Sequence, residues 1–464
     1  MTVAQQIVFR QLPLVIAIIL GGTISTAAES LTSAVQTALT TNPRIRSADA
    51  DVRASAFDLL RNEGEYQPIV SLFGDVGTEF VNDPAGLSPA DNTRWKGTGE
   101  IGVVAELILF DGYRRANQVY ADAARLDRST FELLDASETM ALTVAEAYID
   151  IIRQREVLRV AQEQLARYGE IAEQVQNQVD GGRLPISDQL TAQNRINRAQ
   201  VAITAIERAL RESEAKYRKL VGRGPSGSMR YPTAPKIPGS LDNLIEASIK
   251  NNFRIKSADA NVRIRDHQRD IADAQFLPRV SLNAGGSYGE NLDGQSGEEN
   301  RAFLGLNMSW QLYNGGRESQ LRAFDERKNA AIYDRLSIVR EVVEFAERSW
   351  AAYQLTSQNA NLLSLQTKLN ADIVAQYDAE FQLATRSLLD LLSAETDLFS
   401  SRFAFINAVA SLTFSRYQLL ATQSRLAAHF GVKSSETLLG LTVGPTEGER
   451  PLDVIRKGRP LVQR

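Results

Sequence analysis

Residue types that usually carry out chemistry are scarce in this chain. Its 464 residues include no cysteine and only two histidines, His267 and His429, which lie far apart in the sequence. Without cysteine there is no disulfide, no thiol nucleophile and no cysteine-based metal site. A serine triad would need one of the two histidines, and neither lies near a nucleophile-elbow pattern. The sequence therefore predicts no enzyme and neither a metal nor a cofactor.

The overall composition narrows the class of protein further. Hydrophobic residues make up 43% of the chain, charged residues 23%, and the net charge is -4. These values are ordinary for a folded protein, but the chain is too long for one compact core, so we expect two or more units. A charge balance so close to neutral, without a basic stripe, argues against nucleic acid as the main partner.

The first 28 residues have the layout of a secretory signal peptide. Arg10 supplies a positive charge, Leu12 to Leu20 form an apolar core, and Ala27 and Ala28 are small residues suited to cleavage. A short membrane anchor is the alternative, but the apolar run is well below the ~20 residues that a spanning helix needs. We predict cleavage near Ala27 or Ala28, and an exported protein without a transmembrane helix.

The rest of the chain repeats itself at long range. RIRSADADVR, from Arg44 to Arg53, returns as RIKSADANVR, from Arg254 to Arg263. The match continues upstream into two stretches with apolar residues at helical spacing, which follow Ser30 and Ser240 as candidate N-caps. The predicted organisation is a first repeat, a linker rich in proline and glycine, a second repeat and an irregular tail, at residues 29–221, 222–239, 240–430 and 431–464.

In each repeat the apolar period changes from helical to two after a proline, Pro68 in the first and Pro278 in the second. Apolar side chains then share one face of each run and mostly polar side chains share the other, with Phe73 as an exception on the polar face. Runs of this length and alternation fit transmembrane strands. Four strands are predicted, at about 68–80, 97–110, 278–290 and 301–313.

Alternation alone would also fit two soluble hairpins packed on helices. The signal-like N-terminus and the aromatic residues at the ends of the runs favour the membrane. Phe80 and Trp95 lie at the loop end of the strands, and Phe110, Trp310 and Tyr313 lie at the helix end. Because lipid does not tolerate open sheet edges, four strands must close with strands of other copies. Two chains would give eight strands and three would give twelve, and this argument leaves the copy number open.

Very long helical hairpins follow the strands, at about 114–221 and 317–430. The first bends at Asp180 to Pro185 and the second at Leu383 to Ser387, where Ser387 and Asp390 have capping-box-like spacing. These rods are too polar for lipid and are expected in water. Packing side by side into a helical barrel is their natural use, and a solid helical stalk is the alternative.

Three kinds of motif occur twice, in the same order. They are the entries to the first strands, the aromatic turns after the second strands and the hairpin tips, at Gly64 to Pro68, Ala274 to Pro278, Phe110-Asp111-Gly112, Tyr313-Asn314-Gly315, Gly182 to Ala192 and Ala384 to Ala394. In this order they resemble the TolC-type outer-membrane efflux and secretion ducts. The resemblance covers nearly the whole chain from Ser30 to Phe430.

The resemblance implies a mixed α and β membrane protein with a tandem structural repeat. Its strands would form part of a trimeric 12-stranded transmembrane β-barrel, which a long periplasmic α-helical barrel continues. The implied homotrimer lies in the outer membrane of a Gram-negative bacterium and extends into the periplasm. Its implied partners are a periplasmic adaptor (membrane fusion) protein and an inner-membrane transporter of the ABC type.

The resemblance also implies a periplasmic gate at the hairpin tips. Arg386 matches the gate arginine, and Ser187 and Asp188 match its hydroxyl and carboxylate partners on the neighbouring hairpin. Asp390 matches the first of two constricting acidic residues, so three copies would place like charges at a narrow neck. The alternative for Asp188 and Asp390 is capping of a helix N-terminus, which needs no gate.

Two positions depart from the family pattern, and further tip residues complete the expected site. The second acidic position is Ser393, and the aromatic residue that usually carries a hydroxyl is Phe381. The resemblance therefore implies a thinner ring of carboxylates and a weaker latch. Contacts with the adaptor are expected at the tips, from Gly181, Gly182, Arg183, Leu184, Ala384 and Thr385.

The expected function is the exit duct of a tripartite transport system. The stretch that begins LLDASETMALTVAEAYIDIIRQREVL at Leu133 resembles members paired with type I protein-secretion ATPases, so type I secretion is the expected task. A multidrug or small-molecule efflux duct is the alternative, because the pump mainly chooses the cargo. A structural stalk of the cell envelope is an alternative of another class, and it predicts no pore.

Overall fold

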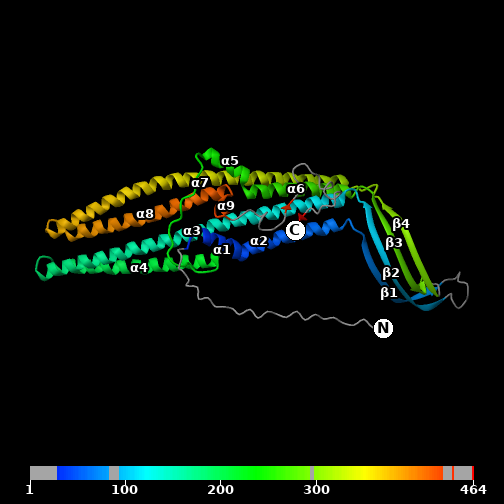
Figure 1. Cartoon of the computed structure of the whole chain (residues 1–464), viewed down its shortest axis with the longest axis horizontal. Helices are drawn as coiled ribbons and strands as arrows, with labels where there is room; N and C mark the ends of the chain where they lie inside the picture. Colours follow the sequence, from blue (N-terminus) through cyan, green and yellow to red (C-terminus); the bar gives the residue numbers. More distant parts are fainter. Residues whose placement is uncertain (1–28, 83–92, 293–296, 432–441, 444–461, 464) are drawn as a thin grey trace, which may run out of the picture.

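The computed structural model describes residues 29–82, 93–292, 297–431, 442–443 and 462–463. The expected signal peptide at 1–28 and most of the expected tail at 431–464 lie outside the described residues. The described chain is elongated, with a four-stranded sheet at one end and long helices that run side by side away from it (Figure 1).

Each repeat contains two short helices, two strands and a long helical hairpin. The first repeat consists of α1 Leu31–Thr41, α2 Pro43–Gly64, β1 Ile69–Asn82, β2 Thr93–Phe110, α3 Arg114–Asp180 and α4 Ile186–Val221. The second consists of α5 Leu241–Asn251, α6 Phe253–Ala274, β3 Arg279–Glu290, β4 Glu298–Ser309, α7 Arg317–Gln382 and α8 Leu388–Thr422. Three short elements follow, α9 Leu426–His429, β5 Thr442–Val443 and β6 Val462–Gln463.

Matching caps explain why the two repeats fold alike. Ser30 and Ser240 accept a hydrogen bond from a backbone N–H in the first turn of α1 and α5, as their positions predict. Asn42 and Asn252 in turn end these helices and cap α2 and α6 through their side-chain oxygens. The duplicated RIRSADADVR and RIKSADANVR segments are therefore the first turns of α2 and α6.

Charged residues of the second of these segments join α6 to the long rods. Arg254 pairs with Glu341 of α7 at 2.7 Å, and Arg263 pairs with Asp127 of α3 at 2.8 Å. Both pairs are about half exposed, so each contributes roughly 0–1 kcal/mol. Their role is to orient α6 between the two long rods.

The four strands form one antiparallel sheet in the order β1-β2-β3-β4. The register aligns apolar residues on one face, where Leu72 lies opposite Val103 and Leu282 lies opposite Leu306. The opposite face is mostly polar, as in the pair Asp75 and Glu100. The sheet therefore has one face suited to an apolar solvent and one suited to water.

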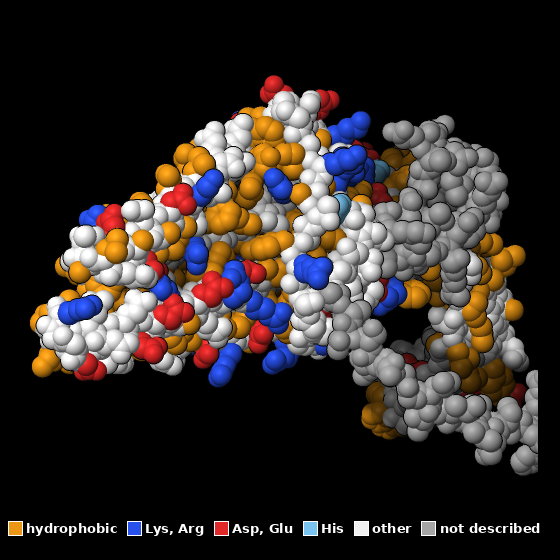
Figure 2. All heavy atoms as spheres, turned by 60° about the vertical axis from the view of Figure 1, so that its left-hand side comes forward, with side chains coloured by type: hydrophobic (Ala, Val, Ile, Leu, Met, Phe, Trp, Pro, Cys, Tyr) orange, Lys and Arg blue, Asp and Glu red, His pale blue; other side chains and the backbone are white. Residues whose placement is uncertain are grey.

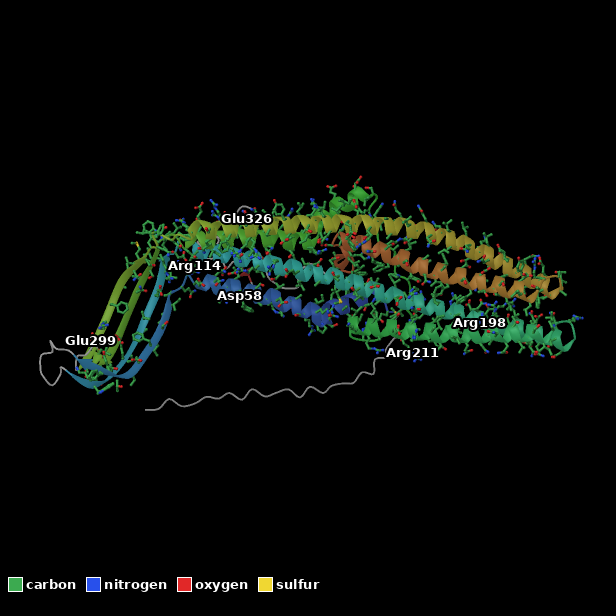
Figure 3. All side chains as sticks on the ribbon, turned by 180° about the vertical axis from the view of Figure 1, so that it is seen from behind. Asp58, Arg114, Arg198, Arg211, Glu299 and Glu326 are labelled. Atoms are coloured by element: carbon green, nitrogen blue, oxygen red, sulfur yellow. The ribbon has the colours of Figure 1, made fainter. Side chains whose placement is uncertain are left out.

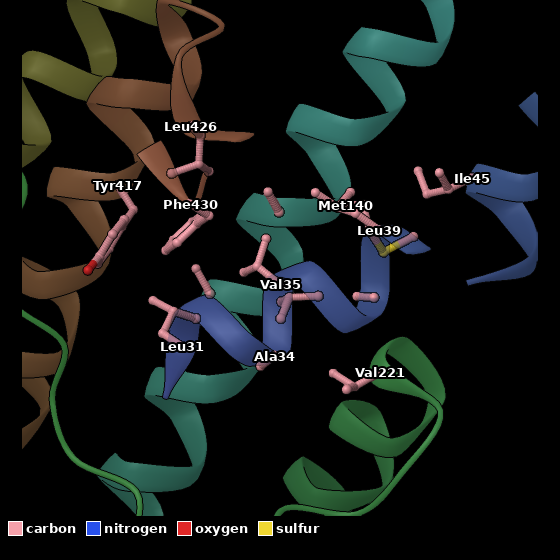
Figure 4. Packing of buried hydrophobic residues seen from close by; sticks show 14 of the residues in the cluster. Leu31, Ala34, Val35, Leu39, Ile45, Met140, Val221, Tyr417, Leu426 and Phe430 are labelled. Carbon is pink, nitrogen blue, oxygen red and sulfur yellow. The ribbon is translucent and has the colours of Figure 1, made fainter. Parts of the chain in front are cut away.

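The helical part packs around α3, which contacts α1, α2, α4, α6 and α8. A buried apolar cluster lies where the short helices meet the rods, and it includes Val35, Met140, Tyr417 and Phe430 (Figure 4). Lys, Arg, Asp and Glu side chains are scattered among apolar ones on the outer surface of this part (Figure 2). In the described ranges, no helix has both the length and the apolar character needed to cross a membrane.

Several element ends differ from the expectation, and the second and fourth strands begin earlier, at Thr93 and Glu298. The fourth strand ends at Ser309 rather than at 313, because β3 begins at Arg279, which lies opposite Ser309, so the residues after Ser309 have no β3 partner. The Trp310 indole N–H donates to the carbonyl of Phe276 at 3.1 Å. The last long helix ends at Thr422 rather than near Phe430. Ser424 adopts a left-handed backbone with φ 52°, which breaks the helix before α9 begins.

Glu138 of α3 holds this break in place. Its buried carboxylate accepts the backbone N–H groups of Leu426 at 2.8 Å and Ala427 at 3.0 Å. Burial raises the pKa of Glu138 to about 7, although these two hydrogen bonds act to lower it. The start of α9 is therefore joined to α3 by a carboxylate that titrates near neutral pH.

The Glu138→Gln variant tests this connection through the pH dependence of stability. A carboxyl whose pKa rises on folding stabilises the fold fully below its unfolded pKa and loses that contribution as the pH rises to about 7. Wild type should therefore lose up to about 3 kcal/mol between pH 4.5 and pH 7.5 from this group. Denaturant unfolding followed by circular dichroism should give a flatter pH dependence for Glu138→Gln, and parallel curves for the two proteins would contradict the assignment.

Candidate functional site

The two hairpin tips lie together at the end of the molecule opposite the sheet (Figure 1). Both turns reverse the chain through a left-handed residue, Gly182 with φ 70° and Ala384 with φ 57°. The first turn suits glycine, whereas Ala384 adopts a conformation that costs an L-residue roughly 1–2 kcal/mol. At the second tip, the backbone N–H and the hydroxyl of Thr385 both donate to the carbonyl of Glu380 at 3.0 Å, which stabilises that turn.

The residues expected to contact an adaptor are mostly exposed at these tips. Gly181, Gly182, Arg183, Ala384 and Thr385 are exposed, and Leu184 is half-buried. Large apolar side chains next to them also face solvent, namely Leu383 with 76% of its surface exposed and Ile186 with 67%. The tips thus present apolar groups beside polar backbone, and the adaptor contact stays a prediction.

Arg386 lies at the second tip and is held by its own hairpin. Its Nε and Nη2 donate to Oε2 of Glu380 at 2.8 and 2.7 Å. Its guanidinium also lies over the ring of Tyr377, 4.1 Å from the ring centre. Hydrogen bonds from Gln376 and Arg386 hold the pKa of Glu380 below its usual value. Glu380 and Tyr377 therefore hold the Arg386 guanidinium against the end of α7.

The expected partners of Arg386 on the first hairpin do not meet it within one chain. Asp188 is in the first turn of α4, where its backbone N–H donates to the carbonyl of Pro185 at 3.0 Å. The exposed Ser187 accepts a hydrogen bond at its carbonyl from the Thr191 hydroxyl at 2.8 Å. No ion pair joins Arg386 to Asp188 among the described residues of the single chain. A contact with Asp188 of a neighbouring copy stays a prediction.

Asp390 takes part in a cap at the start of α8, as the Ser387 and Asp390 spacing predicts. The Ser387 hydroxyl accepts the Asp390 backbone N–H at 3.2 Å and donates to Oδ2 of Asp390 at 2.7 Å. Both Asp390 and Ser393 are exposed, and they are one turn apart on α8. Capping therefore occupies one Asp390 oxygen and leaves the side chain at the surface, and its role in a gate stays a prediction.

Phe381 has a different place from the one expected of a latch residue. Only 3% of its surface is exposed, and its ring lies in an apolar cluster with Tyr168, Ile171, Leu391 and Leu392. This cluster joins α3 to α7 and α8 near the tips. The aromatic ring that faces Arg386 is that of Tyr377, one turn earlier on α7.

A charged cluster around Arg167 connects the two hairpins and was not anticipated from the sequence. Arg167 of α3 pairs through Nε with Glu395 at 2.8 Å, through Nη2 with Asp378 at 2.5 Å and through Nη1 with Glu170 at 3.0 Å. Burial by itself would lower the pKa of Arg167, but its hydrogen bonds to the three carboxylates raise it. One cation thus holds α3 against both α7 and α8.

No local pattern could have revealed this cluster. Glu170 follows Arg167 by one helical turn, a spacing common on helix surfaces. Asp378 and Glu395 lie 211 and 228 residues away in the sequence. Only the packing of the second hairpin on the first brings these carboxylates to Arg167.

The rods leave two helices with an uncovered side. Within the chain α3 packs on α4 and α8, and α8 packs on α7, so α4 and α7 lie at the two edges. On α7, exposed apolar residues recur at heptad-like spacing, as Leu355, Leu362, Leu365, Leu369 and Ile373. On α4, Leu190 and Val201 are exposed, and Arg198 and Arg211 are found along the same helix (Figure 3).

In the sheet, as in the rods, one edge comes from the first repeat and the other from the second. β1 from the first repeat and β4 from the second are the two edge strands, just as α4 and α7 are the two edge helices. One neighbouring copy could therefore cover an edge strand and the edge helix on the same side. Such a copy would be related to the first by rotation about an axis parallel to the rods. The geometry describes a segment of a closed ring.

Comparison with known proteins agrees with this arrangement. The family model described as outer membrane efflux protein matches residues 34–223 and 244–423. The outer membrane efflux protein BepC of Brucella suis is 24% identical over 421 residues, which cover 89% of this chain and 90% of BepC. The alkaline protease secretion protein AprF of Pseudomonas aeruginosa is 26% identical over 369 residues, which cover 74% of this chain and 72% of AprF.

Solved structures share the fold at low sequence identity. The CmeC outer membrane channel of Campylobacter jejuni superimposes with a TM-score of 0.76 at 13% identity, covering 92% of this chain and 89% of CmeC. A likeness at this identity concerns the fold alone.

Proposed function

This chain belongs to the outer membrane efflux protein family, and we propose that it is the exit duct of a tripartite transport system. It is an outer-membrane channel protein of a Gram-negative bacterium and not an enzyme. It works as a homotrimer with a periplasmic adaptor and an inner-membrane transporter, which supplies the energy. The expectation of a TolC-type duct from the sequence is confirmed.

The observation that carries the proposal is a sheet with one apolar face and two open edges. In hydrocarbon each unpaired backbone N–H or C=O costs several kcal/mol, so the free edges of β1 and β4 must pair with other strands. Four strands are too few to close by themselves, since small membrane barrels have about eight. Three copies supply twelve strands, with the polar face turned inward.

The same assembly would cover the exposed sides of α4 and α7. If β4 of one copy pairs with β1 of the next, then α7 of that copy lies beside α4 of the next. The exposed apolar residues on α7 and α4 would then be buried in an antiparallel seam, as in a coiled coil. The seam would also bring opposite charges together. Asp372 lies in the part of α7 near the tip, and Arg195 and Arg198 lie in the part of α4 near its tip.

Cysteine pairs test this seam cleanly, because the native chain has no cysteine. Val201 of α4 and Leu365 of α7 lie at similar distances along their helices from the tips. The Val201→Cys/Leu365→Cys variant should form disulfide-linked dimers and trimers on oxidation, seen on non-reducing gels. Val201→Cys/Leu355→Cys is the control, since Leu355 lies ten residues, or about 15 Å, further along α7. Equal cross-linking of both pairs would contradict the seam.

We also propose that the hairpin tips close the periplasmic end of the duct. Threefold symmetry would bring three copies of Asp390 together, and Ser393 would leave this ring one carboxylate deep. Arg386, held on Glu380 and Tyr377, would lie within reach of Ser187 and Asp188 of the neighbouring copy. The Arg167 cluster would resist separation of the two hairpins inside each copy.

Single-channel recordings in planar bilayers test both the duct and the gate. Wild type should conduct, and Arg386→Ser should conduct several-fold more because the tips lose the cation proposed to contact Ser187 and Asp188 of the neighbouring copy. Arg167→Gln should act in the same direction, since it frees Glu395 and Asp378 from a partly buried pair. Arg208→Gln is the control, because the Arg208 pair with Glu212 is exposed on α4. A wild-type protein without any conductance would instead favour the envelope stalk.

Within the duct function, we propose type I protein secretion as the task. Support comes from the similarity to the alkaline protease secretion protein AprF and from the segment that begins at Leu133. The similarity to the efflux protein BepC supports small-molecule efflux as the second candidate.

Deletion of the gene in its native host separates these two tasks. Type I secretion predicts that a large polypeptide disappears from the culture supernatant and returns on complementation. An unchanged supernatant combined with increased sensitivity to toxic compounds would assign the duct to efflux instead.

A further inference from the structure

Two aromatic rings interrupt the polar face of the sheet. Phe73 of β1 and Phe303 of β4 lie on the same face as Asp75, Glu100 and Ser287, opposite the apolar face. In the trimeric duct this face lines the water-filled lumen. Apolar side chains are not needed there to contact lipid, so these two rings require another explanation.

Each ring lies against a glycine of the neighbouring inner strand. Phe73 is directly opposite Gly102, and Phe303 is directly opposite Gly285. A Cβ added at Gly102 would lie 2.6 Å from Cζ of Phe73, and one added at Gly285 would lie 2.8 Å from Cε1 of Phe303. The glycines therefore make room for the rings, which expose 41% and 48% of their surface along the wall.

The packing of rings on glycines by itself stabilises the sheet, as aromatic residues beside strand glycines often do. The charges next to the rings go beyond that structural role. Asp75 and Glu100, each two residues along the strand from this contact, lie directly opposite one another. Like charges in this position are unfavourable. Neither carboxylate has a hydrogen bond or ion pair to another residue in the described part of the chain.

Other charges on this face are compensated. Arg279 pairs with Glu106 at 3.0 Å, and Arg301 pairs with Glu299 at 2.8 Å. Glu299 shares a row of the sheet with Asp75 and Glu100 through Gly289, and it lies toward the end of the sheet far from the helices (Figure 3). Glu79, on the same face, lies directly opposite Lys96. Asp75 and Glu100 are instead two carboxylates that lie opposite one another, next to the Phe73 ring.

We propose that Phe73, Phe303, Asp75 and Glu100 form a belt in the lumen that transiently binds organic cations with an apolar body. The inference rests on the proposed duct, in which three copies place six rings and six such carboxylates around the wall. An aromatic face attracts a cation and covers apolar surface, and the paired carboxylates supply the opposite charge. The belt would thereby give the duct a second class of cargo besides polypeptides.

A cysteine placed in the belt reports on both charge and binding. Ser287 lies opposite Gly102 in the register, and its Cβ is 2.8 Å from the position of a Cβ at Gly102. Ser287→Cys would be the only cysteine of the chain. Purified trimer in lipid vesicles is treated with a methanethiosulfonate reagent that carries either a trimethylammonium or a sulfonate group. The cationic reagent should react on the order of tenfold faster than the anionic one.

Removal of the charge and of the rings then separates their contributions. In Ser287→Cys with Asp75→Asn and Glu100→Gln, the rate ratio should fall to that of free cysteine. Tetrapentylammonium should slow labelling several-fold, whereas tetramethylammonium, which lacks the apolar body, should not. This protection should be lost in Phe73→Leu/Phe303→Leu, which keeps apolar volume but removes both rings. Retention of the trimer on gels shows that each variant is assembled.

Several outcomes would overturn the belt. They are equal rates for the two reagents, protection that survives in the leucine variant, and equal protection by a neutral apolar compound or peptide. Leu306→Cys on the apolar face is the control, and it should react only with a lipid-soluble maleimide. If Cys at 287 behaved like Cys at 306, the polar face would not line the lumen, and the proposed duct would fail together with the belt.

Discussion

Unpaired backbone groups at the edges of a small sheet are the constraint on which the rest of this structure depends. β1 and β4 present one open edge each, and the sheet turns one face of apolar side chains outward. Hydrocarbon contains no water that could form hydrogen bonds with these backbone groups, so each chain is complete only as part of a ring. Because of the internal duplication, each chain already supplies two similar segments of that ring.

The long helices follow the same order across the molecule as the strands of the sheet. Their order places α4 and α7 at the same two edges as β1 and β4, so one neighbour covers both. The proposed seam between copies would combine exposed leucines with scattered charges, whereas the contact inside each copy relies on a buried cluster and on Arg167.

The two repeats are alike in backbone and unlike in detail at the turn from strand to rod. In the first repeat, Arg115 is buried, pairs with Asp111 at 2.9 Å and lies over the Tyr66 ring. In the second, Arg317 lies over Phe276 but pairs with Asp273 near the surface. The first turn is thus fixed by a buried ion pair, and the second depends on an aromatic contact and exposed charges. Both repeats thus place an arginine over an aromatic ring, but from different positions, because Arg317 is the first residue of α7 whereas Arg115 is the second residue of α3.

Sequence by itself determined the order of elements, the two faces of each strand, the caps of the short helices and the Ser387–Asp390 cap, because periodicity and capping are local properties. Local patterns could not reveal which carboxylates surround Arg167, that Phe381 is buried, or that Glu138 caps the segment after the last long helix. Those contacts join residues that are far apart in the chain. Arg386 shows the limit most clearly: its partner Glu380 is only six residues away, yet the left-handed turn at Ala384 and the position of Tyr377 decided the pairing.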